Sequence, residues 1–143
     1  MAKKKQNLKG SGTSIDFLVK TTRAERGSMS ENRFFSISKS WEDKPDWFLR
    51  VVQSSVEEDH HDGIDAWVET TDAGRIPIQI KSSDKARVVF EQGTVLRGRL
   101  PVNRPLVVVV RPDSSDEHIR RCILIGTGYL RHLRLINGCK QSA

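Results

Sequence analysis

The sequence predicts an α/β domain with a mixed central sheet flanked by helices, and three observations lead to this prediction. Three extended runs succeed one another between residues 47 and 83, and the segments between them are too short for crossover helices. The pattern at residues 84–92 predicts a crossover helix. The continuously apolar run at residues 106–110 is typical of a strand that is covered on both faces. A meander, a crossover helix and a buried strand together give a mixed sheet.

The first predicted element is a helix that begins at Ser28 or Ser30, since either serine can cap its first turn. This helix carries one acidic residue, Glu31, and three large apolar residues, Phe34, Phe35 and Ile37. We expect Phe34 and Phe35 to face the core. Upstream, residues 14–19 fit either a short helix or a strand.

The first strand is expected over residues 47–56, after a turn at residues 44–46 that contains a proline. Strand side chains alternate between the two faces of a sheet. This alternation predicts one face with Phe48, Arg50, Val52 and Ser54, and a second face with Leu49, Val51 and Gln53.

The second and third strands form a hairpin, in which residues 71–73 make the loop with Gly74 next to it. One face of the hairpin is apolar and is expected to fix the strand register. It consists of Ile64, Ala66, Val68, Ile76, Ile78 and Ile80. In this register Asp65 lies opposite Gln79 on the other face, with Lys81 beside them.

The second half of the chain predicts alternating helices and strands. Ser83 is a candidate cap for the helix at residues 84–92, and Gly93 is a candidate stop. After the strand at residues 106–110, three further elements are expected: a short helix at 113–121, a strand at 122–126 and a basic helix at 128–136.

With 143 residues, the chain has the length of one domain with a real core. Residues 1–13 are expected to form a flexible basic arm, residues 14–139 the domain, and residues 140–143 a frayed end. The net charge of +6 favours polyanionic partners, although many basic proteins bind no nucleic acid. The two cysteines are too few for a disulfide framework, and we see no membrane span and no signal segment. These features predict a cytoplasmic protein without a membrane partner.

The polar residues of the hairpin suit hydrolysis of a phosphodiester. Mg²⁺ binds oxygen ligands and is usually held by one or two carboxylates together with water and substrate. Asp65 supplies a carboxylate, and either the Gln79 side-chain carbonyl or the Ile80 backbone carbonyl supplies a second oxygen. Lys81 is a candidate for orienting the attacking water or stabilising the transition state. A solvated hairpin face often carries the same residue types, so spacing alone leaves both interpretations open.

A family resemblance favours the catalytic interpretation. Gly63-Ile64-Asp65 followed by Ile78-Gln79-Ile80-Lys81-Ser82 resembles the PD-(D/E)XK nuclease superfamily, in the variant where Gln replaces the Glu of the E-x-K element. Such variants occur in restriction endonucleases that cleave methylated DNA and in relatives of archaeal Holliday-junction resolvases. The resemblance implies a restriction endonuclease-like α-β-β-β-α-β core and a site for Mg²⁺ or Mn²⁺.

The resemblance also implies an acidic metal ligand on the first helix. Residues 27–31, Gly-Ser-Met-Ser-Glu, resemble the G-x-x-x-E of that helix, so Glu31 is the matching position. The expected metal ligands are therefore Asp65, Gln79, Ile80 and Glu31, and the expected catalytic residues are Asp65, Gln79, Lys81 and Glu31.

Several residues around this site are candidates for binding nucleic acid. They are Ser82, Ser83, Lys85, Arg87 and Trp67. Trp67 shares the face of Asp65 and is suited to stacking on a base, although packing is the commoner role of a tryptophan. Helix capping explains Ser83 equally well, and a solvated helix face explains Lys85 and Arg87.

The predicted function is therefore metal-dependent hydrolysis of DNA, with branched or modified DNA among the substrates that the resemblance allows. A homodimer is compatible with a domain of this size. The first alternative is a nucleic-acid-binding module of the same fold with weak or lost catalysis, because Gln79 removes one negative charge from the site. The second alternative is a protein-interaction component without nucleic-acid activity.

Overall fold

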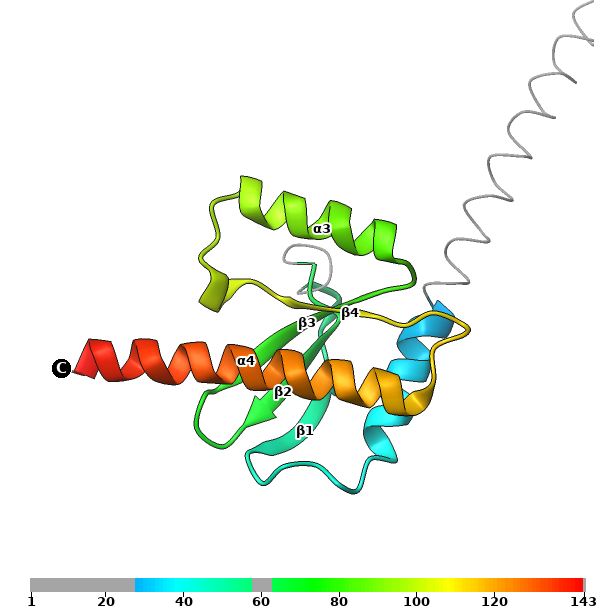
Figure 1. The fold of residues 1–143 in the computed structure, drawn as a ribbon, viewed down its shortest axis with the longest axis horizontal. Helices are drawn as coiled ribbons and strands as arrows, with labels where there is room; N and C mark the ends of the chain where they lie inside the picture. The colour runs from blue at the N-terminus through cyan, green and yellow to red at the C-terminus, as the bar shows by residue number, and fades with distance from the viewer. Residues whose placement is uncertain (1–27, 58–62, 143) are drawn as a thin grey trace, which may run out of the picture.

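The computed structural model describes residues 28–57 and 63–142, with side chains described as far as residue 138. Residues 28–39 are helical. The next elements along the chain are β1 (Phe48–Gln53), β2 (Ala66–Thr70), β3 (Arg75–Lys81), α3 (Asp84–Leu96), the 3₁₀ helix η1 (Pro101–Asn103), β4 (Leu106–Val109) and α4 (Asp116–Ser142) (Figure 1). The expected arm at 1–13 and the expected element at 14–19 lie outside the described residues. None of the described helices has the length and apolar character needed to cross a membrane.

The four strands form one mixed sheet in the order β1-β2-β3-β4. β1 and β3 both run antiparallel to β2, and β4 runs parallel to β3. α3 makes the crossover between the two parallel strands, as a parallel connection requires. The prediction of an α/β domain with a mixed sheet flanked by helices is therefore confirmed.

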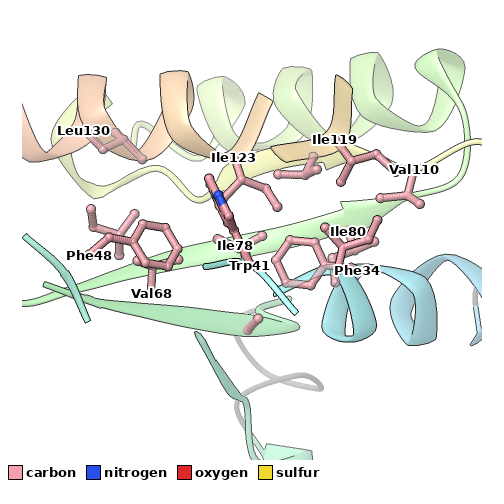
Figure 2. Packing of buried hydrophobic residues seen from close by; sticks show 14 residues of the cluster. Phe34, Trp41, Phe48, Val68, Ile78, Ile80, Val110, Ile119, Ile123 and Leu130 are labelled. Atoms are coloured by element: carbon pink, nitrogen blue, oxygen red, sulfur yellow. The ribbon is translucent and has the colours of Figure 1, made fainter. Parts of the chain in front are cut away.

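One face of the sheet forms the hydrophobic core, and the predicted apolar face of the hairpin lies on it. Ala66, Val68, Ile76 and Ile78 are fully buried. The helix at residues 28–39 contributes Phe34 and Ile37, and α4 contributes Ile119, Ile123 and Leu130 (Figure 2). Each fully buried aliphatic or phenylalanine side chain stabilises the fold by about 1.5–3 kcal/mol. The spacing of the isoleucines therefore fixes which hairpin face is left for polar chemistry.

β1 contains an irregularity that changes the predicted faces. Phe48 pairs with Thr70 and Arg50 pairs with Glu69, so Leu49 is an extra residue without a counterpart on β2. A bulge of this kind shifts the alternation by one residue. Phe48 is buried in the core, and Val51 packs against the core as well. The predicted grouping of Phe48 with Arg50, Val52 and Ser54 is therefore wrong, and the strand is shorter than residues 47–56.

Residues 116–142 form one long helix, α4. The predicted helix at 113–121, strand at 122–126 and helix at 128–136 are therefore wrong. Ile119, Ile123, Thr127 and Leu130 are buried at spacings of three and four residues, which is a helical period. The helix comes so close to β4 at Gly126 that a Cβ there would lie 2.8 Å from Leu106 Cδ2. The glycine that suggested a strand end thus allows close packing. Residues 140–142, predicted as a frayed end, are also helical.

α3 is longer than predicted. Ser83 is its N-cap and accepts a hydrogen bond from Ala86 N at 3.2 Å, as expected. Gly93 does not stop the helix, which continues to Leu96. It ends where Gly98 adopts a φ of 70°, a conformation that glycine reaches at little cost.

α4 also holds the hairpin loop in place. The Arg131 guanidinium donates a hydrogen bond to Asp72 Oδ1 at 2.8 Å and forms a second bond with Oδ2. This pair lowers the pKa of Asp72 below its usual range, chiefly through the hydrogen bond. Arg134 donates to the Ala73 carbonyl at 3.0 Å, and burial lowers the pKa of Arg134. The loop that sets the hairpin register is therefore tied to the helix layer.

Candidate functional site

Two hydrogen bonds place Asp65 beside Gln79. Asp65 immediately precedes β2, and its backbone N–H donates to the Ile78 carbonyl at 2.9 Å. Its carboxylate Oδ2 accepts from the Ile80 N–H at 2.7 Å. These bonds reach the residues on either side of Gln79, so the hairpin brings Asp65 and Gln79 together in the predicted register. Asp65 is only 7% exposed, and a charged acceptor strengthens its bond to Ile80.

Among the described residues, four buried side-chain nitrogen or oxygen atoms have no hydrogen-bond partner, and Gln79 Oε1 is the one oxygen among them. Gln79 is 7% exposed, and its Oε1 is buried without a hydrogen-bond partner in the described part of the chain. A buried acceptor without a partner costs about 1–3 kcal/mol. The position is therefore suited to a donor or a cation that approaches this oxygen.

The start of β2 is held from both sides. Ser54, the residue after β1, donates its N–H to the Asp65 carbonyl at 3.1 Å and its hydroxyl to the Ile64 carbonyl. Gly63 has a φ of 65°, which an L side chain rarely adopts. A Cβ at Gly63 would lie 3.6 Å from Gln79 Oε1 and 3.4 Å from Phe90 Cε2. The approach to the buried amide oxygen is thus lined by a glycine and an aromatic ring.

Lys81 ends β3 on the same face as Gln79, because strand side chains alternate. Its ammonium Nζ lies 5.0 Å from the centroid of the Phe90 ring. Its backbone carbonyl accepts from Val110 N at 2.8 Å, which fixes the strand end. No ion pair between described residues involves Lys81. Among the described residues, the ammonium is therefore held by a ring contact and not by an ion pair with a carboxylate.

The helix that carries Glu31 lies at the same end of the sheet as Lys81. Ser30, the neighbour of Glu31, donates to the Val110 carbonyl at 2.8 Å, and Val110 N bonds the Lys81 carbonyl. Glu31 itself is partly buried in the helix over residues 28–39. The first helix and the hairpin thus converge at the carboxyl ends of β3 and β4.

Trp67 lies two residues from Asp65 on the polar face. Its indole Nε1 is buried without a hydrogen-bond partner among the described residues. The Arg75 guanidinium carbon lies 5.7 Å from the Trp67 ring centroid. Glu69 pairs with Arg50 at 2.7 Å and with Arg75 at 3.2 Å, and the hydrogen bond from Arg50 chiefly lowers the pKa of Glu69. An aromatic ring and two guanidinium groups therefore lie on this open side of the sheet.

The predicted nucleic-acid-binding residues at the start of α3 differ in burial and in their partners. Ser82 and Ser83 are partly buried, and Lys85 is exposed. Arg87 lies 3.9 Å from Asp84, which also pairs with Arg111 at 2.9 Å. Ser83 is used as a helix cap, and Arg87 is partly used in this small ion-pair network. Lys85 presents its charge to solvent.

The described residues contain no group of three or more His, Cys, Asp or Glu side chains that could hold a metal ion. The expected ligand set consists of two carboxylates, one amide and one backbone carbonyl, so it does not form such a group. Its donors are all oxygen atoms, which suits Mg²⁺ or Mn²⁺ and does not suit zinc. Gln79 Oε1, which lacks a hydrogen-bond partner within residues 28–57 and 63–142, is the atom that best fits a hard cation.

Two residues of the site, Phe90 and Ser54, were not predicted from the sequence. The sequence places Phe90 only within a helix, and its contact with Lys81 depends on how α3 lies on the sheet. Searches against protein-family models, curated proteins and solved structures find no match to this chain.

Proposed function

We propose that this chain is a metal-dependent nuclease that hydrolyses DNA phosphodiester bonds at Asp65 and Gln79. One observation carries the proposal: Gln79 Oε1 is buried beside a buried carboxylate and has no hydrogen-bond partner among the described residues. A folded protein rarely leaves such an acceptor unpaired unless the site has a use for it. Asp65 and Gln79 would hold a hard cation here, and the cation would give Gln79 Oε1 the partner that it lacks among the described residues.

The donor set supports Mg²⁺ or Mn²⁺ as that cation. Asp65 would supply a carboxylate oxygen, Gln79 its amide oxygen, Ile80 its backbone carbonyl and Glu31 a second carboxylate. Mg²⁺ in proteins is usually bound by only one or two carboxylates, because it keeps several waters and binds substrate phosphate. When bound, the ion would neutralise charge on the scissile phosphate and activate a water molecule.

The chain's own residues would then perform three tasks. Lys81 would donate N–H bonds to a phosphate oxygen or to the attacking water, where negative charge increases in the transition state. Trp67 would stack on a base near the cut, and Arg75 would add a positive charge beside it. Ser82 and the exposed Lys85 would contact the backbone of the DNA.

The fold and the net charge agree with this proposal. A helix, three antiparallel strands, a helix and a parallel strand succeed one another, and this order supports the α-β-β-β-α-β core that the resemblance implies. We therefore propose that the chain is a member, in the variant with Gln at the E-x-K position. The net charge of +6 favours phosphate contacts through counterion release.

Calorimetric titration of Mn²⁺ tests the proposal. Asp65→Asn keeps an oxygen that can accept from the Ile80 N–H but removes the charge, so it separates metal binding from folding. We expect its Mn²⁺ affinity to fall by more than about tenfold, since even outer-shell changes cost that much. Gln79→Glu should bind Mn²⁺ more tightly, because a carboxylate is a better ligand than an amide. Glu91→Gln, an exposed acid on α3, is the matched control and should not change the affinity.

Cleavage of supercoiled plasmid and of branched DNA is measured in parallel. Loss of both binding and cleavage in Asp65→Asn supports the nuclease. Absence of Mn²⁺ binding to the wild type contradicts it and favours the alternative, a DNA-binding module without catalysis. The missing cluster of three metal-ligating side chains in the described residues is the observation that keeps this alternative open. The module should still bind DNA, with an affinity that decreases steeply with salt.

A further inference from the structure

We infer that Phe90 of α3 is a positioning residue, and that its ring holds the Lys81 ammonium beside the Asp65–Gln79 pair. The inference rests on the proposed function for its consequence in catalysis, but the contact itself is tested separately. Lys81 Nζ lies 5.0 Å from the Phe90 ring centroid, within the range of a cation–π interaction.

Phe90 lies close to two other residues of the site, Gly63 and Lys81. Ser83 caps α3, and the helix then brings Phe90 back over the polar end of the hairpin. The ring atoms Cε2 and Cζ would lie 3.4 and 3.9 Å from a Cβ at Gly63, and Gln79 Oε1 would lie 3.6 Å from the same point. The ring therefore lies close to Gly63 on one side and to the Lys81 ammonium on the other.

No carboxylate in the described part of the chain forms an ion pair with this ammonium. Asp84, three residues further along, pairs with Arg111 at 2.9 Å and lies 3.9 Å from Arg87. The Lys81 side chain has four carbon atoms and many rotamers, so an unrestrained ammonium would spread over a wide volume. The contact with the aromatic ring reduces the number of positions that the ammonium can occupy, and it needs no charged partner from residues 28–57 and 63–142.

A ring contact also has a chemical advantage over an ion pair. A carboxylate would neutralise the ammonium and accept its N–H groups. The face of a phenylalanine attracts the cation but leaves its full charge and its N–H donors for another acceptor. Phe90 thus keeps Lys81 ordered and still able to bond a phosphate oxygen or a water molecule.

The test uses the resonances of the Lys81 Cε protons in protein labelled with ¹³C-lysine, assigned by their loss in Lys81→Arg. In the wild type the ring current of Phe90 should move these resonances upfield. Phe90→Leu should return them to ordinary lysine positions, and Phe90→Tyr should preserve the upfield shift. Val95→Ala, at an exposed position of the same helix, is the control and should leave them unchanged. Thermal melting establishes that each variant is folded.

The kinetic consequence is measured with Mn²⁺-dependent plasmid cleavage. Phe90→Leu should lower kcat by about two- to fivefold with little change in KM, and Phe90→Tyr should restore it. Equal Lys81 shifts in the wild type and in Phe90→Leu would overturn the inference, and so would a Phe90→Tyr variant that behaves like Phe90→Leu. A wild type that shows the ring-current shift but never cleaves DNA would instead contradict the nuclease and leave the contact standing.

Discussion

Replacing Gln79 with Leu separates the stability of the fold from the needs of the site. Leucine has a similar volume and removes the buried Oε1 that has no partner in the described part of the chain. An unsatisfied buried acceptor costs about 1–3 kcal/mol, so Gln79→Leu should raise the metal-free free energy of unfolding by about that amount. For a chain of this length the gain corresponds to an increase in Tm of roughly 3–10 °C.

The opposite effect is expected when Mn²⁺ is present. At a concentration one hundred times Kd, a bound ion stabilises the native state by about 2.7 kcal/mol. The wild type should therefore gain in Tm when EDTA is replaced by Mn²⁺, and Gln79→Leu should gain much less. Differential scanning fluorimetry in the two buffers measures both effects. A Gln79→Leu variant that melts below the wild type in EDTA would show that the amide oxygen is satisfied and would refute the reasoning.

Three other substitutions test the packing and the loop contact. Gly126→Ala should lower the free energy of unfolding by about 1–3 kcal/mol in a urea titration, because its Cβ would lie 2.8 Å from Leu106 Cδ2. Ser83→Ala should cost about 1 kcal/mol in the same assay through loss of the N-cap bond. The pKa of Asp72 is lowered by Arg131, so its stabilisation is present above the ordinary Asp pKa of about 4 and is lost as the pH falls through the lower native value. The Tm difference between wild type and Asp72→Asn should therefore disappear on acidification, and a difference that persists would contradict the pair.

The alternation of apolar and polar residues along the two strands is sufficient to predict the hairpin and its register. Ile76, Ile78 and Ile80 must all face the core, so Asp65 can lie beside Gln79 in only one alignment. The apolar pattern alone therefore places Asp65 and Gln79 together. The strand β4 is predictable from its four consecutive apolar residues, although only Val108 among them is buried.

The wrong predictions concern the faces of β1 and the elements over residues 113–136. In both places the local sequence pattern indicates one structure and tertiary packing produces another. No sequence signal marks the bulge at Leu49. Because of this extra residue, the side chains that follow it in β1 point to the opposite face from the predicted one. The run Cys-Ile-Leu-Ile-Gly at residues 122–126 has the β-branched residues and terminal glycine of a short strand. The structure shows that Ile119, Ile123 and Leu130 share a buried helix face. It also shows that a Cβ at position 126 would collide with the Leu106 side chain. A glycine that permits close approach cannot be distinguished from one that ends an element without the partner surface.

The same dependence on tertiary packing explains why Phe90 escaped prediction, and it connects Phe90 with Gln79. A glutamate at position 79 would lie on the face of Lys81, two residues away, and would attract the ammonium directly. The neutral amide does not provide that attraction. Phe90 of α3, eleven residues from Gln79 in sequence, attracts the ammonium through a contact of 5.0 Å. The neutral Gln79 and the Phe90 ring are thus two parts of the proposed arrangement, in which the charge of Lys81 would remain available for phosphate.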